Sequence, residues 1–246
     1  MDKVGCRHEV GGTSSGSRGE ELVGSRTYTA AQSAAIIEAG VLAARTEIDA
    51  LGDLPDQLGD SFVESIEIIR SSAGKVFVAG SGTSSAVARR TAHLLSVTGT
   101  PAVFLHPMDA LHGSLGAVES DDILLAFSKG GGSTELNQLC RAVREVGAPV
   151  IAVTETPDSA FASDAEVVVL LSTRPAADPG GMIGMGSTLL AALWADALAR
   201  VLMRIRGRSW EQVLRTHPAG AVGSRGMRDE PEQQPLVLPE REVDIL

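Results

Sequence analysis

Two loops rich in glycine and hydroxyl side chains carry the residue types that suit chemistry on an anionic ligand. One reads Gly80-Ser-Gly-Thr-Ser-Ser85 and the other Ser128-Lys-Gly-Gly-Gly-Ser-Thr-Glu135. Each stands between a short apolar run and a helical pattern. Glycines let the backbone approach a ligand, and free N–H groups at a helix start attract an anion. The donors predicted to bind a small phosphate ester are Ser81, Thr83, Ser84, Ser128, Ser133 and Thr134.

The first loop is a poor match to a dinucleotide-binding fingerprint. Ser85 stands where the third glycine is required, and the next apolar run ends in Leu-His rather than in an acid for a ribose. A small phosphate ester therefore fits better than NAD. The alternative interpretation is a tight strand-to-helix turn capped by Ser84.

Glu135 and three histidines are the candidate proton carriers. Glu135 lies in the first turn of a predicted helix, where its simplest role is capping together with Ser133 or the backbone. Histidine carries protons near neutral pH, which favours His106, His112 and His217, although each could instead have a structural role. Their spacing demands no metal, and we expect no metal and no other cofactor.

Five short apolar runs alternate with helical patterns and must position these residues. Continuous apolar strands between helices are typical of a parallel sheet covered on both faces. The expected strands are 75–79, 102–105, 123–127, 150–153 and 167–171, and the expected helices are 29–51, 61–71, 84–97, 133–146, 157–163 and 186–206. We predict a three-layer α/β/α sandwich, flavodoxin-like, with N-terminal helices added. Ligands of such folds bind beyond the carboxyl ends of the strands, which places both loops at one sheet edge.

Composition narrows the class of protein. The 246 residues are 43% hydrophobic and only 3% aromatic, with a net charge of -10, which argues against binding nucleic acid. The longest apolar stretch, 182–201, contains Asp196 and Arg200 and indicates a buried helix rather than a membrane span. The sequence shows no secretory signal, and its two cysteines do not suggest a disulfide framework. A cytoplasmic location is therefore expected. We divide the chain into a flexible tail (1–26), one domain (27–225) and an acidic, proline-rich tail (226–246).

The loop sequences resemble the SIS (sugar isomerase) domain, and more specifically the arabinose-5-phosphate isomerase family. The resemblance rests on GSGTSS, FLHPMDALHGSLG, SKGGGSTEL and THPAGAVG, in that order, and covers about residues 30 to 225. It implies a five-stranded parallel sandwich that binds sugar phosphates and often forms tetramers. Many family members carry a pair of CBS domains after this domain; the present sequence ends before one, so nucleotide regulation through them is not expected.

The resemblance also implies roles for single residues. Glu135 matches the glutamate that ends the family's serine loop, His112 the histidine of its His-Gly-Asp-Leu-Gly motif, and His217 its late histidine before proline. Two family site residues are replaced: Thr83 stands at a lysine position and Ala176 at a glutamate position. Gly130 and Gly132 also replace a serine and an acid. An uncharged donor must therefore substitute for the lysine.

These observations predict an aldose–ketose isomerase acting on a sugar phosphate through an enediolate. Glu135 is the expected base, with a pKa that partial desolvation could raise, and His217 or His112 would open the ring or shuttle a hydroxyl proton. The alternative is a non-catalytic sugar-phosphate-binding or regulatory SIS protein, and a third possibility is a SIS-type lyase. The apolar faces of 29–51 and 186–206 predict a homo-oligomer, dimer or tetramer, in which His217 could complete a neighbour's site.

Overall fold

The computed structural model describes residues 27–219 and 234–239. They fall into two compact units, Met1–Leu42 and Ala43–Leu246, and helix α1 (Ala30–Leu51) runs through the boundary between them. The first unit is described from residue 27 on, and its part of α1 exposes Ile36, Ile37 and Val41. The predicted tail 1–26 lies outside the described residues, as does most of the tail 226–246.

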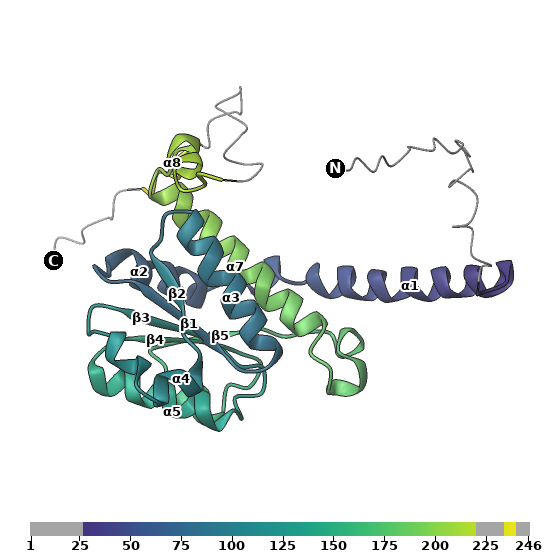
Figure 1. Cartoon of the computed structure of the whole chain (residues 1–246), viewed down its shortest axis with the longest axis horizontal. Helices are drawn as coiled ribbons and strands as arrows, with labels where there is room; N and C mark the ends of the chain where they lie inside the picture. The colour runs from purple at the N-terminus through teal and green to yellow at the C-terminus, as the bar shows by residue number, and fades with distance from the viewer. Residues whose placement is uncertain (1–26, 220–233, 240–246) are drawn as a thin grey trace, which may run out of the picture. The chain divides into compact units, whose positions relative to one another are not determined.

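The second unit is built on one parallel sheet, as the sequence predicted. Its strands are β1 (Val76–Gly80), β2 (Ala102–Phe104), β3 (Ile123–Phe127), β4 (Val150–Thr154) and β5 (Val167–Leu170). All neighbours pair in parallel in the order β2-β1-β3-β4-β5 (Figure 1). In this order β2 lies on one side of β1, and the chain then crosses over to place β3 on the other side of β1. The gap beyond the carboxyl ends of β1 and β3 is therefore the expected ligand site.

Helices cover both faces of this sheet. One face packs against α2 (Asp60–Ser71), α3 (Thr83–Val97) and α7 (Gly186–Ile205). The other packs against α4 (Pro107–Leu111), α5 (Thr134–Val146) and α6 (Ala160–Ser163). The short helix α8 (Trp210–Arg215) follows α7, and the 3-10 turns are Pro55–Gln57, Ser114–Ala117, Pro175–Ala177 and Pro179–Gly181.

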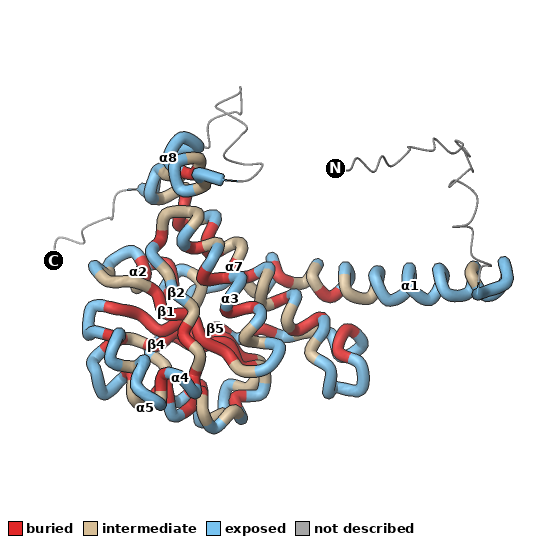
Figure 2. The backbone as a smooth tube through the Cα atoms, viewed as in Figure 1, coloured by how far each residue is buried: buried red, intermediate tan, exposed pale blue. Residues whose placement is uncertain are grey.

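Alternate side chains along the strands point into two separate hydrophobic cores, one on each face of the sheet. Val76 and Val78 belong to the core under α3 and α7, whereas Phe77 and Ala79 belong to the core under α5. The three central strands, β1, β3 and β4, are buried along their whole length (Figure 2), whereas the edge strands β2 and β5 are partly exposed. Trp194 of α7 is completely buried, with edge-to-face ring contacts on either side. The sheet is thus a rigid platform for the loops at its carboxyl edge.

A buried carboxylate, Asp122, ties the amino ends of β1 and β3 together. It accepts hydrogen bonds from the N–H of Lys75 at 2.8 Å, from the N–H of Glu119 at 2.9 Å and from the ammonium of Lys75 at 3.2 Å. Burial alone would raise the pKa of Asp122, but these hydrogen bonds outweigh it and lower the pKa. The carboxylate therefore stabilises the folded state in its charged form.

We expect Asp122→Asn to lower the free energy of unfolding by about 1–3 kcal/mol at neutral pH. The reason is that the hydrogen bonds from Lys75 and Glu119 then lose the negative charge that strengthens them. A carboxyl whose pKa is depressed by folding stabilises above its ordinary pKa, and that stability is lost as pH falls through the folded value. The difference between the variant and the wild type should therefore shrink below about pH 4. Urea unfolding at neutral and acid pH measures it; a difference that does not depend on pH would contradict this assignment.

Candidate active site

The loop after β1 depends on a glycine for its close turn into α3. A Cβ on Gly80 would lie 2.6 Å from the carbonyl oxygen of Ser84, so a larger residue would push the loop from the helix. The N–H groups of Ser84 and Ser85 donate to the carbonyls of Ser81 and Gly82, at 3.1 and 3.0 Å. These two amides are used within the turn, which leaves the hydroxyl groups as the more accessible donors.

The loop after β3 is anchored at its middle. Gly131 has φ of +65°, and a Cβ there would lie 2.3 Å from the Ser159 hydroxyl oxygen. The side-chain amide of Asn137 donates a hydrogen bond to the Gly131 carbonyl oxygen at 3.0 Å. Ser133 precedes α5 without making a side-chain cap, and Thr134 is the exposed first residue of that helix. The loop conformation is thus fixed by packing rather than by a serine cap.

Glu135 meets residues from two other strand ends. Its carboxylate lies close enough to the Ser81 hydroxyl, in the loop after β1, and to the His106 imidazole, which follows β2, for both to lower its pKa. The Ser81 hydroxyl has the largest effect, followed by the backbone N–H of Glu135 itself, and burial opposes them. The pKa of Glu135 is therefore lowered, in the direction that its place at a helix start favours, and desolvation does not raise it.

His106 has an unsatisfied nitrogen beside this pair. Its Nδ1 is buried and hydrogen-bonds to no group in the described part of the chain; the nearest carboxylate, that of Asp109, lies 3.9 Å away. Ser81, His106 and Glu135 thus place a hydroxyl, an imidazole and a carboxylate after the carboxyl ends of three strands. They are candidate acid–base groups near the point where the strand order reverses.

A small pocket of about 30 Å³ lies beyond the ends of β3 and β4. It contains two of the predicted binding residues, Ser84 and Ser128. The sequence analysis assigned no role to the other polar residues around it, which are Lys129, Thr154, Glu155, Ser187 and Thr188. Thr83 is next to this region, since a Cβ on Gly184 would be 3.4 Å from its hydroxyl oxygen. The predicted hydroxyl groups thus gather at one edge of the sheet.

The carboxylate in the loop before α7 is Asp178 rather than a residue at position 176. Ala176 lies in the 3-10 turn Pro175–Ala177 and offers no acid. Asp178 is buried; it accepts the N–H of Ser187 at 3.0 Å and pairs with the Lys129 ammonium. The strand-end rule used for Ser128 would also have selected Lys129 and Glu155, which closely follow β3 and β4.

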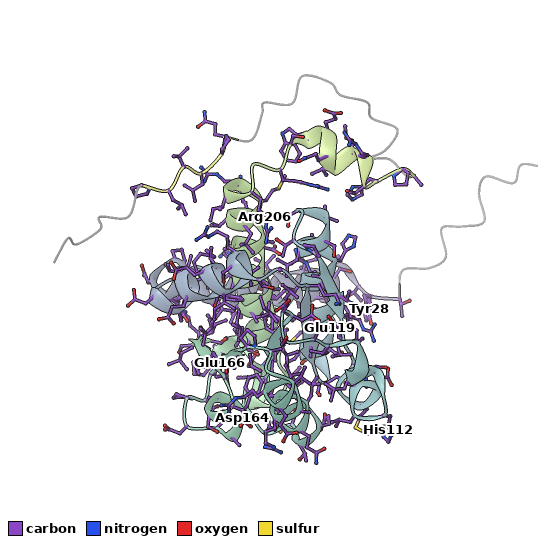
Figure 3. All side chains as sticks on the ribbon, turned by 90° about the vertical axis from the view of Figure 1, so that its left-hand side faces the viewer. Tyr28, His112, Glu119, Asp164, Glu166 and Arg206 are labelled. Atoms are coloured by element: carbon purple, nitrogen blue, oxygen red, sulfur yellow. The ribbon has the colours of Figure 1, made fainter. Side chains whose placement is uncertain are left out.

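Within the described residues, neither predicted catalytic histidine forms a hydrogen bond or ion pair with Glu135. His112 is exposed after α4 and is labelled in Figure 3 at the surface of the α/β unit. His217 follows α8, with its Nδ1 2.8 Å from the Val213 carbonyl oxygen. The first turns of α7, as far as Ala191, line the Ser84 pocket, and the rest of the helix extends about 20 Å further before α8 follows. Figure 3 accordingly places Arg206, just after α7, at the end opposite to His112.

A larger cavity of about 610 Å³ lies between α3, α7 and α8 and contains none of the predicted site residues. Its lining mixes apolar side chains with Arg200, Arg204 and Asp196, and Asp196 is paired with Arg90. Hydroxyl donors and a free acid–base pair are what a sugar phosphate needs, and the carboxyl edge of the sheet supplies them. We therefore place the candidate site at that edge rather than in the larger cavity.

The described residues form neither a metal cluster nor a membrane-spanning helix. Over 27–219 and 234–239, no three His, Cys, Asp or Glu side chains gather as a metal site would require. No helix in these same ranges has the length and apolar character needed to cross a bilayer.

Known proteins share this fold and these loops. The SIS domain family model matches residues 68–199. The arabinose 5-phosphate isomerase GutQ of Escherichia coli CFT073 is 38% identical over 193 residues, covering 78% of this chain and 60% of that protein. The arabinose 5-phosphate isomerase KdsD of Pseudomonas aeruginosa is 36% identical over 179 residues, covering 73% and 55%. The chain thus spans roughly 55–60% of the length of these relatives.

A solved structure agrees with the sequence relatives. The c3406 protein of Escherichia coli CFT073, in complex with arabinose 5-phosphate, superposes with a TM-score of 0.72 at 26% identity, covering 78% of this chain and all of that one. The order of strands, the glycine and hydroxyl loops and the family match agree with one another. The chain belongs to the SIS domain family.

Proposed function

We propose that this protein is an aldose–ketose isomerase for a sugar phosphate, with arabinose 5-phosphate as the first substrate to test. The arabinose 5-phosphate isomerases among its relatives, and a similar structure with this sugar phosphate bound, support the proposal. The observation that carries it is the placement of Ser81, His106 and Glu135 after the carboxyl ends of β1, β2 and β3, beside the switch point of the sheet. The proposed location is the cytoplasm, in keeping with the free, buried thiol of Cys140.

The proposed reaction moves one proton between neighbouring carbons. Glu135 removes the proton from C2 of the open-chain aldose; the electron pair of the C–H bond forms the C1=C2 double bond, and the carbonyl electron pair moves to the C1 oxygen, which gives the enediolate. A second proton passes from the C2 hydroxyl to the C1 oxygen. Protonated Glu135 then returns its proton to C1 as the C2–O bond becomes the carbonyl of the ketose. The lowered pKa keeps Glu135 ionised at neutral pH, in the form that accepts a proton. The reaction as written needs neither an oxidant nor a reductant.

The hydroxyl-rich segments are proposed to hold the substrate. Ser84, Ser128 and Thr83 would donate to the phosphoryl oxygens, with Ser133 and Thr134 at the start of α5 completing the rim. Ser81 would orient the Glu135 carboxylate through the hydrogen bond between them. Fixed donors of this kind stabilise developing negative charge because they need no reorganisation during the reaction.

We further propose that His217 acts in the site of a neighbouring subunit. Within one chain the length of α7 separates it from the Ser84 pocket. An apolar stripe on the exposed side of α7, including Met185, Leu189 and Leu193, supports burial against a second copy, in a dimer or tetramer. His112, which is exposed after α4, would be available to the same partner.

The function is tested by NMR with arabinose 5-phosphate in D₂O. The proposal predicts conversion to the ketose phosphate, with deuterium entering at the carbon that receives the proton. Binding without conversion or exchange would instead favour the alternative, a non-catalytic sugar-phosphate-binding or regulatory protein. Neither binding nor conversion with any pentose or hexose phosphate would contradict both.

His106→Asn is expected to lower kcat by about 10–100-fold while the protein stays folded, because an imidazole beside Glu135 serves proton transfer. His93→Asn in the middle of α3 is the matched control and should retain wild-type turnover. Steady-state kinetics and thermal melting of both variants make the comparison. Equal turnover of the two variants would remove His106 from the mechanism.

A further inference from the structure

The small pocket beside Ser84 and Ser128 contains a cation that has no role so far. Lys129 follows Ser128 directly, its side chain is 39% exposed, and it is the one Lys or Arg among the described residues that line this pocket. The surrounding hydroxyls come from the starts of two helices and the ends of two strands. A ligand group that enters the pocket therefore meets one ammonium and several hydroxyl donors.

Two carboxylates hold this ammonium in place. Asp178 pairs with it directly, and a Glu155 oxygen lies 3.7 Å away. Burial alone would lower the pKa of Lys129, but the hydrogen bond to Asp178 and the attraction of both carboxylates raise it. Lys129 is therefore charged throughout the neutral range, and its side chain is restrained.

Both carboxylates have further hydrogen-bond partners besides the ammonium. Asp178 also accepts the N–H of Ser187 near the start of α7, where the helix dipole is positive. Glu155 accepts the N–H of Thr173 at 3.1 Å through its other oxygen. The Lys129 ammonium and the first turn of α7 thus face the same small pocket, which the Glu155 carboxylate also lines.

An unsatisfied hydroxyl points to a missing partner at this place. Ser187 lines the pocket and is only 8% exposed; its buried hydroxyl lies near the Asp178 carboxylate but makes no hydrogen bond of good geometry in the described part of the chain. Buried polar groups normally find a partner. The pocket volume of about 30 Å³ suits a single polar group, such as a phosphoryl oxygen, rather than a whole sugar.

We propose that Lys129 is a substrate-binding residue that pairs with the phosphoryl group of the sugar phosphate, and that Asp178 is its positioning residue. The proposal rests on the proposed function, since it assumes a phosphorylated ligand at this edge. Lys129 supplies the positive charge that Thr83, at the family's lysine position, does not provide. It does so from the end of β3 rather than from the end of β1. The proposal also gives the orphan hydroxyl of Ser187 an acceptor.

The structure contains a matched control for this lysine. Lys75 pairs with the buried Asp122 at the opposite edge of the sheet, and its side chain is 38% exposed, against 39% for Lys129. Asp122 and Asp178 are each 2% exposed as side chains. Lys75→Met and Lys129→Met therefore remove equivalent ion pairs, and only the second lies in the proposed site.

The experiment measures binding of arabinose 5-phosphate and of inorganic phosphate by isothermal titration calorimetry, with melting curves for each variant. Lys129→Met should weaken both ligands by at least about tenfold, the loss expected for a charge-assisted hydrogen bond. Lys75→Met should bind as the wild type does, with a similar loss of thermal stability. Lys129→Arg should retain part of the affinity because it keeps the charge.

The role of Asp178 is tested by kinetics of Asp178→Asn. A positioning role predicts a raised KM with kcat nearly unchanged, whereas general damage to the fold would lower the amount of active enzyme and leave KM unchanged. If Lys129→Met binds both ligands as tightly as Lys75→Met does, the proposal is overturned and the proposed function stands. If the wild type binds no phosphorylated ligand, both are overturned.

Discussion

Glu135→Gln is expected to lower kcat for aldose–ketose isomerisation by about 10²–10⁴-fold, the contribution typical of a positioned base. The amide keeps the size of the side chain and can still accept a hydrogen bond from Ser81, so substrate binding should persist. Conversion of arabinose 5-phosphate, followed by NMR, gives kcat, and calorimetry gives the affinity. Deuterium exchange into the substrate should fall in parallel with kcat.

The control for this variant lies on the same helix. Glu145 is exposed near the end of α5, and Glu145→Gln removes the same charge far from the three loops. It should leave kcat within a factor of about two, as surface changes away from a site usually do. Full activity of Glu135→Gln would show that another group, for example Glu155 in the neighbouring pocket, acts as the base.

Mixing two inactive variants is expected to restore activity if His217 serves a neighbouring subunit. Glu135→Gln and His217→Ala each disable every site of their own homo-oligomers. In a mixed dimer one site pairs a normal Glu135 with a normal His217, so random mixing should return about a quarter of wild-type activity. The variants are unfolded and refolded together, or co-expressed, before the assay.

The physical basis of this prediction is the length of α7. The part of α7 beyond Ala191 spans about 20 Å before α8 and His217 follow, which is too far for direct proton transfer to the pocket that Ser84 lines. Mixed samples that stay as inactive as the separate variants, while His217→Ala alone is inactive, would contradict a shared site. Full activity of His217→Ala would remove that histidine from the reaction altogether.

The fold was predictable because each strand is a continuous apolar run between glycine-bearing loops. The run 123–127 has the same bounds as β3, and the other four strands differ from their predicted bounds by one residue at one or both ends. The short helices α4 and α8 were missed, since five or six residues give too little periodicity to recognise. Helix α1 was found, but periodicity alone does not say what its exposed Ile36, Ile37 and Val41 contact.

The sequence indicated which segments meet at this edge of the sheet, but not their contacts. The carboxyl-end rule placed Ser84 and Ser128 at the same edge, and both line one pocket in the structure. The direction of the Glu135 pKa shift depends on its spatial neighbours, the Ser81 hydroxyl above all, which the sequence does not place. Lys129 was read as part of a glycine loop, because its partner Asp178 lies 49 residues later in the chain.

The most direct test of the central claim is an experimental structure with arabinose 5-phosphate bound. The account predicts the phosphoryl group between segments 80–85 and 128–134, near Ser84, Ser128 and Lys129, with C1 and C2 facing Glu135. A sugar phosphate bound instead in the cavity between α3, α7 and α8, with the edge beyond β1 and β3 left unchanged, would contradict it.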